Sequence, residues 1–535
     1  MTDKSRTRSS ASPHCSKAVV AALAALSLAA LPPNGLCAQQ TPAYEELQIF
    51  SAVLNHIRLN YADSVTYTGL VRAAIDGMLR SLDPHSYFVS RRDWETRSAL
   101  ERGELAVTGM ELAEEDSTAT VLSVRRDSPA AKGGVLPGDR VVRINDTSVV
   151  GLKIEELERH LAGPKGSKVR VELERGPRLE PDTFAVTLKR TFLEAESAVQ
   201  MSGMADSVTG YVGLAWFGPK AGDQVHDAVN QLKRQGARQV ILDLRGNPGG
   251  VVDAAVEIAA EFFPKGTVIF RTKGRKKGAS QDYVTRRDGD FREMPLIALV
   301  NSRSASASEA VAGSLQDHDR ALVLGRRTFG KALVQTGFFI MPSGDMVELT
   351  IARVHTPSGR VIQRRYKGIG VQQYRSFAGK SGAEEDTLVV FRTGRGREVR
   401  GGGGIVPDVP LPAPAELPVW WSVATDSGFD VAVADSVALT LPATPVARAQ
   451  WLAGRAQWHE RLLAPFLERV RRRLHVNARP DSLVAERLAL SLAGRAADVR
   501  WPPDGGVQLR IRNDPDIRAA LTYFPRLPEL LAGPE

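Results

Sequence analysis

The feature that most restricts the fold is an unbroken apolar run at residues 296–300, which leads directly into the sequence NSRSASASEAVAGSL. Apolar runs without alternating polar residues are typical of strands buried on both faces, and such strands occur mainly in parallel sheets covered by helices. A second run of this kind lies at 321–325, one helix length further on. This order predicts an α/β fold in which the serine-rich segment joins a buried strand to a helix.

The same pattern extends over residues 195–412. The stretches GYVGLAWF and VILDL are predicted strands on either side of a helix at 221–234. The glycine-rich turn LRGNPGG then precedes a helix at 252–262. We therefore expect one α/β domain across this region.

A chain of 535 residues is too long for one hydrophobic core, so further domains are expected on both sides. Residues 42–92 carry two helical apolar patterns and predict a pair of helices. Residues 96–190 alternate short strand patterns with Gly/Pro turns, which predicts a small β-rich domain with one or two helices. Residues 413–535 are rich in Pro, Ala, Leu and Arg and are predicted to be mainly helical.

The helical C-terminal region contains one apolar stripe with a spacing of four residues. It runs through a proline, and its members are Trp458, Leu462, Phe466, Val470 and Leu474. This spacing favours packing in a core, or contact with an oligomer partner, over binding to a membrane.

The first 38 residues form a segment of their own. Basic residues precede an apolar run at 18–31, Pro32-Pro33 ends the run, and Leu36-Cys37-Ala38 offers a small-residue cleavage site. The run is short for a membrane span. We expect a signal peptide at 1–38 that is cleaved on export to the periplasm or cell envelope. The alternative is an uncleaved anchor that keeps the protein at the membrane.

Cysteine and charge exclude several classes of function. Both cysteines, Cys15 and Cys37, lie in the predicted signal peptide, so the mature chain has no thiol nucleophile, disulfide or thiolate metal site. The net charge of +9 is partly carried by the same segment and is otherwise spread along the chain. It does not indicate a nucleic acid partner.

A near match to a phosphate-binding loop stands at Gly325-Arg-Arg-Thr-Phe-Gly330-Lys331-Ala332. The last position of that motif needs a hydroxyl group to bind Mg²⁺, and Ala332 has none. The residues that follow are predicted to form a strand, whereas the motif requires a helix there. Nucleotide binding is therefore not expected.

Other catalytic motifs are absent from the sequence, including Gly-x-Ser-x-Gly, His-Glu-x-x-His and any Cys/His cluster. A Ser-His-Asp triad stays open because its members can lie anywhere in a sequence, but none of the nine histidines has a suggestive setting. His85, in the turn LDPHSYF, is more often structural than catalytic in such a position.

Ser306-Ala-Ser-Glu309 fits a helix capping box, with Ser306 as the N-cap and Glu309 at the third helical position. This structural interpretation is sufficient on local grounds. A helix N-terminus also offers free amides and a positive dipole to a nucleophile. A serine nucleophile there needs a base, and no histidine is indicated.

Lys331 is the candidate base. It stands in TFGKALVQ among apolar residues, with no acidic residue within ten positions. Burial in such surroundings lowers the pKa of a lysine and favours its neutral form. Gln335 lies four residues further on, on the same side of a predicted strand, and is placed to orient the amine.

The segment NSRSASASEAVAGSLQDHDRALVLGRRTFGKALVQ closely resembles the active-site segment of the C-terminal processing peptidases, the tail-specific serine proteases of peptidase family S41. LDLRGNPGG, TPSGRVIQ and GGGGIVPDV match further landmarks of that family in the same order, and the similarity runs from about residue 45 to 410. SPAAKGGVLPGDRVVRIND resembles the PDZ pattern. Nothing comparable is recognised in 413–535.

The resemblance implies a multidomain α/β protein. An N-terminal helical segment at 42–92 is expected to be followed by a PDZ domain at 96–190. A ClpP/crotonase-like α/β serine protease core is then expected at 195–412, with a mainly helical accessory region at 413–535.

The resemblance also implies residue roles. Ser306 is expected to be the nucleophile, Lys331 the base and Gln335 the third member, while the amide of Ala307 and that of Gly249 or Gly250 hold the oxyanion. The residues expected to support the site without reacting are Glu309, Thr328, Arg245 and Asn247. Ser304 and Ser308 are expected to be bystanders.

PDZ domains bind an extended peptide C-terminus by strand addition, beside a loop that holds the carboxylate. This loop is expected at AVTGME, residues 106–111, with Val107, Thr108, Gly109 and Met110 touching the peptide. Ala106 and Val107 stand where the family usually has glycines, which makes this loop stiffer.

We therefore expect an exported serine endopeptidase that cuts proteins near accessible C-terminal tails and needs no cofactor, metal or nucleotide. A second copy of the chain or an adaptor protein is a further expected type of partner. Two alternatives remain: a catalytically inactive PDZ scaffold, and a retinoid or lipid carrier built on the same core fold. The presence of Ser306, Lys331, Gln335 and both glycine-rich loops favours the enzyme.

Overall fold

The computed structural model describes residues 43–101, 105–115, 118–125, 128–136, 138–152, 154–175, 181–192, 197–369, 374, 389–426, 428–502 and 505–533. The predicted signal peptide lies outside these residues. The chain divides into two compact units, Met1–Gly77 and Met78–Glu535. No helix within the described ranges is both long and apolar enough to cross a lipid bilayer.

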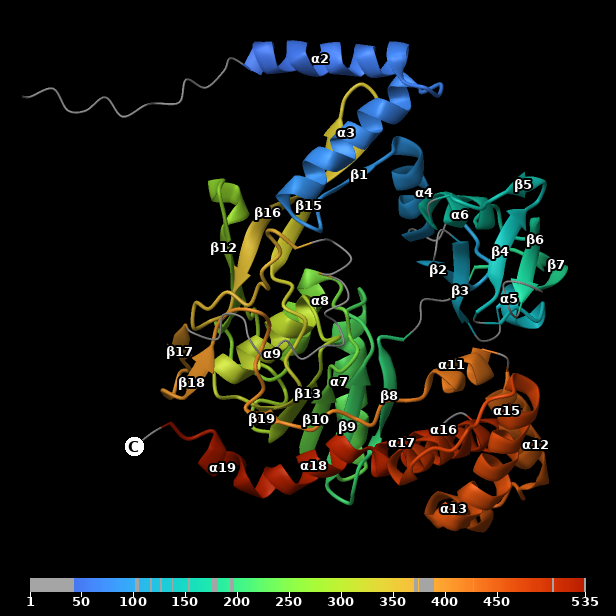
Figure 1. Cartoon of the computed structure of the whole chain (residues 1–535). Helices are drawn as coiled ribbons and strands as arrows, with labels where there is room; N and C mark the ends of the chain where they lie inside the picture. The colour runs from blue at the N-terminus through green and yellow to red at the C-terminus, as the bar shows by residue number, and fades with distance from the viewer. Residues whose placement is uncertain are drawn as a thin grey trace, which may run out of the picture. The chain divides into compact units, whose positions relative to one another are not determined.

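The first unit contains α2 (Ala43–Asn60) and most of α3 (Tyr67–Leu82), so both predicted N-terminal helices are present (Figure 1). Their expected packing as a pair is not found. No residue of α2 is buried, and its apolar stripe, which includes Leu47 and Phe50, stays exposed. A hydrogen bond from the Tyr67 hydroxyl group to Asn55 links the two helices at 3.2 Å. Both helices are amphipathic, as the sequence indicates. Among the described residues of this unit, no other element covers their apolar stripes.

The β-rich region forms one sheet with the strand order β2-β3-β4-β6-β7. In β6, Val169, Val171 and Leu173 are fully buried and alternate with charged residues, because successive side chains of a strand point to opposite faces. β2 pairs only with β3 among the described strands, so β2 is an edge strand. The elements are β2 (Met110–Glu115), β3 (Thr118–Val124), α5 (Pro129–Lys132), β4 (Arg140–Ile144), β5 (Thr147–Ser148), α6 (Ile154–Leu161), β6 (Lys168–Arg175) and β7 (Asp182–Lys189).

The α/β region predicted at 195–412, called the core domain below, is built on a second sheet with the order β19-β14-β13-β10-β9-β8. Its strands run parallel except β8, which is antiparallel to β9. The predicted buried runs are β13 and β14. The elements are β8 (Val199–Met204), β9 (Thr209–Leu214), β10 (Gln239–Asp243), β13 (Leu296–Val300), β14 (Leu322–Gly325) and β19 (Val409–Pro410).

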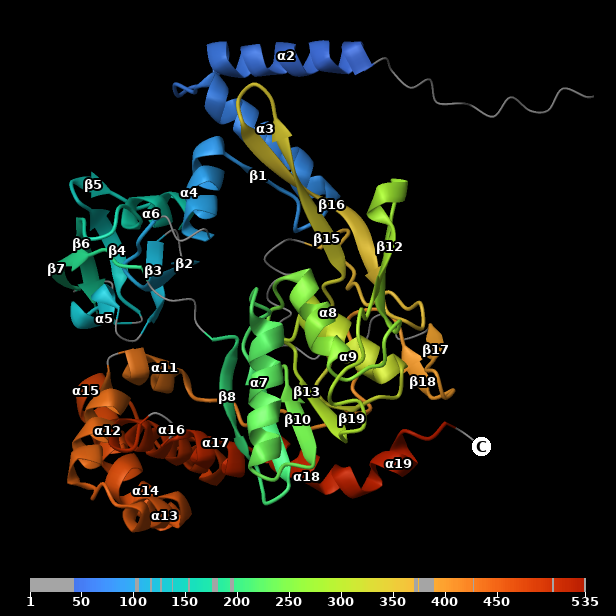
Figure 2. The ribbon, with the colours of Figure 1, turned by 180° about the vertical axis from the view of Figure 1, so that it is seen from behind.

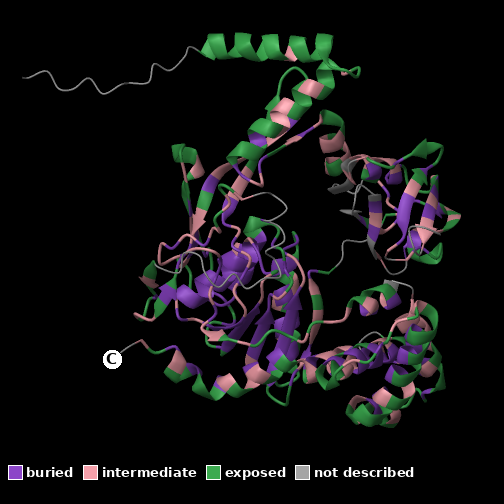
Figure 3. Ribbon diagram, in the orientation of Figure 1, coloured by how far each residue is buried: buried purple, intermediate pink, exposed green. Residues whose placement is uncertain are grey.

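Helices cover both faces of this sheet, and the strand period shows which residues face each layer. In β13, Ala298 packs toward α7 (Ala221–Arg234), α8 (Val252–Ala260) and α9 (Ala307–Asp317). Ile297 and Leu299 point the other way and share a core with residues of α17 (Val507–Asn513), α18 (Pro515–Tyr523) and α19 (Leu527–Leu530). These last helices run across the strands in both views (Figures 1 and 2). Buried residues concentrate in the sheet and in α9 (Figure 3).

A third sheet has the strand order β1-β16-β11-β12, and β15 pairs with β16 beside it. Its long hairpin, β15 (Leu333–Ile340) and β16 (Asp345–His355), begins two residues after Lys331, where the sequence predicts a strand. The other strands of this sheet are β1 (Tyr87–Val89), β11 (Val268–Gly274) and β12 (Gln281–Val284), and α4 (Arg91–Glu101) follows β1. β17 (Val390–Arg392) and β18 (Glu398–Arg400) form a separate two-stranded sheet.

The predicted helical C-terminal region has its own core. Trp458, Leu462, Phe466 and Val470 are buried in it, so the four-residue stripe is a packing surface. Pro465 lies in the first turn of α15, directly after a π-helical turn at His459–Leu463, and irregular turns of this kind are common beside prolines. The helices are α11 (Val419–Asp426), α12 (Phe429–Thr440), α13 (Pro445–Ala453), α14 (Arg455–Trp458), α15 (Ala464–Leu474) and α16 (Ser482–Arg500).

The boundary predicted at 412/413 divides elements that share one hydrophobic core. Helices α17, α18 and α19 pack on the second sheet, in the core domain. We therefore propose that the core includes them, and that the helical region proper ends near α16.

Candidate active site

Three loops of the core domain follow neighbouring parallel strands and meet at one edge of the second sheet. They follow β10, β13 and β14, which are adjacent in the strand order. The carboxyl ends of parallel strands are where ligands bind in sheets of this type. The first loop contains the NPGG turn, the second contains Ser306 and the third contains Lys331.

Two serines expected to be bystanders join the first two loops. Ser304 Oγ donates a hydrogen bond to the carbonyl of Leu244 at 2.7 Å, and Ser308 Oγ donates to the carbonyl of Asn247 at 2.9 Å. Both serines are fully buried. They do not have to react, but small hydroxyl groups are required here because they satisfy buried carbonyl groups where the loops touch.

Asn247, which is expected to support the site, makes hydrogen bonds to three other parts of the chain. Its amide group donates to the carbonyl of Leu214 at 2.9 Å and accepts the amide of Gly249 at 2.8 Å. Its own carbonyl also accepts the amide of Ala305 at 3.0 Å. Asn247 is completely buried and fixes the turn against the start of α9.

Ser306 is the N-cap of α9 and has a left-handed backbone, with φ 56° and ψ −113°. This conformation is rare for residues other than glycine and costs about 1–3 kcal/mol. It persists because the carbonyl of Ser306 accepts the amides of Glu309 at 2.9 Å and Ala310 at 3.0 Å. Backbone strain of this kind is typical of functional sites.

The Glu309 carboxylate links Ser306 to the lysine loop. Its Oε2 accepts the main-chain amide of Ser306 at 2.9 Å and that of Lys331 at 2.8 Å. Its Oε1 accepts the Thr328 hydroxyl group at 2.6 Å and the amide of Gly330 at 2.7 Å. Burial raises the pKa of Glu309 to about 7 against the opposing effect of these four hydrogen bonds. One fully buried side chain therefore holds the backbone of both candidate catalytic residues.

The Lys331 side chain is partly buried, and this burial lowers the pKa of its ammonium group below the ordinary 10.5, against the opposing charge of Glu309. The apolar sequence around Lys331 indicates burial but gives no sign of an acidic neighbour. Glu309 comes from a distant part of the sequence and is placed there by α9. Both residues are described, and no hydrogen bond joins Lys331 Nζ to Ser306 Oγ.

The two candidate glycines of the oxyanion site have different surroundings. A side chain at Gly249 would lie 2.9 Å from Ser306 Cβ and 3.0 Å from the nitrogen of Ala307, so this glycine faces the serine. The amide of Gly249 is bound to Asn247. Within the described ranges, the amides of Gly250 and Ala307 make no hydrogen bond to another residue. These two amides are therefore free to bind a ligand.

Gln335 is not brought to Lys331 by a hydrogen bond. Its Nε2 donates to Thr350 Oγ1 at 3.2 Å, across the paired strands β15 and β16. A different glutamine, Gln363, accepts the amide of Ala332 at 2.7 Å, beside the lysine. The role of Gln335 stays a prediction. Gln363 is the last residue of the landmark TPSGRVIQ, but that motif gives no sign that Gln363 lies beside the lysine.

His85 lies in the structural network that the turn motif suggests. Its Nε2 lies 3.1 Å from the hydroxyl group of Tyr374, to which the side chain of Gln363 also donates, at 3.2 Å. The turn at His85 is thus connected to the main-chain amide of Ala332, next to Lys331, through the side chains of Tyr374 and Gln363.

Arg245 is surrounded by three carboxylates and none of the expected active-site groups. It pairs with Asp243 at 2.6 Å, with Asp514 at 3.0 Å and with Asp516 at 2.8 Å. The last two belong to the N-terminus of α18. No pattern in the sequence indicates that Asp514 and Asp516 pair with Arg245, although Asp-Pro-Asp is a typical helix start.

In the candidate PDZ loop, the first two main-chain amides already have partners within the protein. The amides of Ala106 and Val107 donate to the carbonyls of Gly163 at 2.8 Å and Thr191 at 3.0 Å. The amides of Thr108 and Gly109 make no such bond within the described part of the chain. Thr108 is buried and Gly109 has a φ of 88°, so the turn is held open just before the edge strand β2, which starts at Met110.

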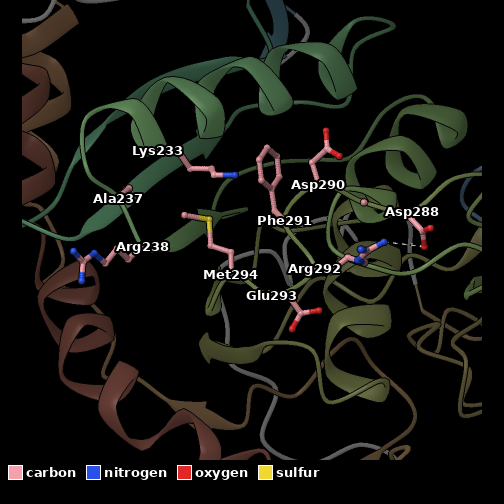
Figure 4. A pocket seen from close by; sticks show the side chains of 10 residues that line it. Lys233, Ala237, Arg238, Asp288, Asp290, Phe291, Arg292, Glu293 and Met294 are labelled. Carbon is pink, nitrogen blue, oxygen red and sulfur yellow. Dashed lines mark ion pairs between the residues drawn. The ribbon is translucent and has the colours of Figure 1, made fainter.

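A hollow among the described residues lies away from these loops, at the opposite end of the strands. It has a volume of about 550 Å³ and a charged lining that includes Lys233, Arg238 and Asp290 (Figure 4). His226, Glu261 and Asp290 nearby offer ligand atoms within 4.8 Å of one another. Glu261 already pairs with His226 and with Arg287, so these groups have partners within the protein.

The chain is similar to known peptidases and PDZ domains. A model of peptidase family S41 matches residues 208–373, and a PDZ domain model matches residues 120–175. A carboxy-terminal-processing protease of Bartonella bacilliformis is 33% identical over 334 residues, which cover 61% of this chain and 74% of the relative. A carboxyl-terminal-processing protease of Synechocystis is 31% identical over 302 residues, covering 56% and 69%.

Among solved structures, a photosystem II D1 C-terminal processing protease is 27% identical, with a TM-score of 0.42, and covers 69% of this chain and 88% of that one.

The fold and the sequence matches define a serine-type peptidase that carries a PDZ domain. The chain belongs to peptidase family S41, the carboxy-terminal processing proteases. The family, the multidomain α/β fold class and the presence of a PDZ domain, all predicted from the sequence, are thereby confirmed.

Proposed function

We propose that this protein is an exported endopeptidase that cleaves proteins near their C-termini, with Ser306 as nucleophile and Lys331 as general base. The observation that carries the proposal is the Glu309 carboxylate, whose Oε2 binds the main-chain amides of both residues. A nucleophile and its base must be held at a fixed separation, and this single buried contact provides it.

The reaction begins when the neutral amine of Lys331 takes the proton of the Ser306 hydroxyl group while Oγ attacks the peptide carbonyl carbon. The resulting ammonium group then returns this proton to the leaving amine as the peptide bond breaks, which leaves an ester on Ser306. Water, activated by the same amine, hydrolyses the ester and restores the free serine. The contact between Oγ and Nζ closes when substrate is bound, as is common for catalytic hydrogen bonds.

The oxyanion formed by the attack is bound by the amides of Ala307 and Gly250. Both are free in the described structure, whereas the amide of Gly249 is engaged by Asn247. Gly249 serves instead by its missing side chain, because any Cβ there would meet Ser306. The left-handed backbone of Ser306 keeps its hydroxyl group at the end of α9, where the helix dipole favours developing negative charge.

The experiment that tests the proposed function uses a fluorophosphonate probe, which reacts with activated serines. The wild-type protein is expected to be labelled and to hydrolyse unstructured peptides, whereas Ser306→Ala loses both properties. Ser302→Ala is the matched control because Ser302 lies in the same loop, four residues before Ser306. Absence of labelling and of hydrolysis in the wild type would support an inactive PDZ scaffold, and equal labelling of wild type and Ser306→Ala would reject Ser306 as the nucleophile.

The PDZ domain is proposed to hold the C-terminal tail of the substrate. Its edge strand β2 can accept a further strand, and the uncommitted amides of Thr108 and Gly109 precede it, where a carboxylate would sit. Since Val107 donates its amide to Thr191, the carboxylate is bound by fewer amides than the sequence suggests.

Amidation of a substrate's C-terminal carboxylate is therefore expected to lower kcat/KM for a tailed protein by about 10- to 100-fold, the value of one or two charged hydrogen bonds. Hydrolysis of a short peptide without a tail should change little, because the PDZ domain supplies binding and not bond breaking. Equal rates for the free and amidated tails would contradict this role.

Export is proposed from the basic residues, the apolar run and the small-residue cleavage site at 1–38. N-terminal sequencing of the protein recovered from the cell envelope checks it, and a start at Met1 or Thr2 would contradict cleavage.

A further inference from the structure

Asp516, near the start of α18, contacts both loops that flank the catalytic serine. Its Oδ2 accepts a hydrogen bond from Arg245 Nη1 at 2.8 Å. Its Oδ1 accepts one from Arg326 Nη2 at 2.9 Å, and Arg326 Nη1 makes a second contact with Oδ2. Asp516 is only 5% exposed, so these contacts are largely shielded from water and salt.

The two arginines stand at the bases of the loops. Arg245 follows β10 and precedes the turn with Asn247, Gly249 and Gly250. Arg326 follows β14 directly, and its loop leads to Lys331. The amide of Arg326 donates to the carbonyl of Val300, at the end of the strand that carries the serine loop. One carboxylate thus joins the oxyanion loop to the base loop.

The helix that carries Asp516 is held firmly. Asp514 caps α18 by accepting the amides of Asp516 and Ile517, and it also pairs with Arg245 at 3.0 Å. Ile517 and Ala520 are buried against the outer face of the sheet, together with Leu299 of β13. A carboxylate on a fixed helix can set the distance between two loops, whereas one on a mobile segment cannot.

We propose that Asp516 is a positioning residue of the peptidase, through which α18 sets the spacing between the oxyanion amides and Lys331. The inference rests on the proposed roles of Ser306, Lys331 and Gly250. It makes α18, which lies beyond the predicted end of the core at residue 412, part of the catalytic apparatus. A displacement of α18 relative to the sheet lowers the catalytic rate without a change at the serine or the lysine.

The experiment compares Asp516→Asn with Asp498→Asn in the full chain. Asp498 lies in α16, is similarly shielded and pairs with Arg510 at 2.8 Å, but touches neither loop. For each variant, kcat and KM with a short peptide, the rate of fluorophosphonate labelling and the melting temperature are measured, beside Ser306→Ala.

Asp516→Asn is expected to lower kcat and the labelling rate by about 10- to 100-fold with KM nearly unchanged, because small displacements of reacting groups have effects of this size. Asp498→Asn should keep kcat, even where its melting temperature falls. Where Asp516→Asn does not fold, Arg326→Lys serves instead. It keeps the charge, loses the forked contact and should lower kcat about 10-fold.

A kcat of Asp516→Asn within about twofold of wild type would overturn the positioning role, as would equal losses of kcat in the two variants. Activity that persists in Ser306→Ala would reject the proposed function itself. An inactive Ser306→Ala beside a fully active Asp516→Asn rejects only the role of Asp516.

Discussion

Replacing Lys331 by arginine is expected to abolish peptide hydrolysis, with a loss of at least about 10⁴-fold in kcat, although the positive charge is kept. Arginine does not deprotonate in proteins, so it has no lone pair with which to accept the serine proton. The double variant with Ser306→Ala should be no less active than either single variant, because nucleophile and base act as one unit. Peptide turnover by the purified variants is the measurement.

The pH dependence provides a second test of the same base. Burial lowers the pKa of Lys331 below 10.5, so activity should rise with pH along one ionisation centred below that value and reach a plateau above it. If Lys331 were a fixed cation, activity would instead fall as the lysine lost its proton. Substantial hydrolysis by Lys331→Arg would contradict the assignment.

Replacing Glu309 by glutamine is expected to have the next largest effect. Each carboxylate oxygen accepts two hydrogen bonds, and an amide would turn a donor group toward two of these donors. We expect kcat to fall by about 10²- to 10³-fold and the free energy of unfolding by about 2–4 kcal/mol. Enzyme kinetics and urea unfolding measure the two effects.

Glu261→Gln is the matched control, since Glu261 is also a buried carboxylate of the core but pairs with Arg287 and His226 instead. It should lose stability and keep kcat. Normal activity of Glu309→Gln would contradict a positioning role for Glu309.

The raised pKa of Glu309 also has a consequence for stability. Between its ordinary value of 4.5 and about 7, the folded protein binds the proton more tightly than the unfolded chain. The stability contributed by this group is therefore fully present below pH 4.5 and is lost as the pH rises to about 7. Glu309→Gln should lack this part of the pH dependence, which unfolding curves at several pH values reveal.

Local patterns in the sequence were enough to predict the elements that carry the candidate site. Ser306 and Glu309 are three residues apart, so the helix start and the bond from the Ser306 amide to Glu309 follow from the capping pattern alone. The buried strand β13 and the strand after Lys331 follow from their apolar runs.

Contacts between distant segments could not be predicted in this way. The amide of Lys331 meets Glu309, and Arg245 meets Asp514 and Asp516, only because the sheet topology brings three loops and α18 together. Charge alone does not identify such pairs in a chain with 70 basic and 61 acidic residues. The unburied stripe of α2 shows the converse, since an amphipathic pattern specifies a helix but not what the helix packs against.

The packing of α17–α19 on the sheet has a consequence for how the protein is made. Ile297, Leu299, Leu322 and Leu324 are covered by Ile511, Ile517 and Phe524, which leave the ribosome long after Ser306 and Lys331. Until then, one apolar face of the sheet is open to water, and the charges of Arg245 and Arg326 lack Asp516. The order of synthesis thus delays completion of the protease core, and a nascent chain that already contains every catalytic motif is not yet a folded peptidase.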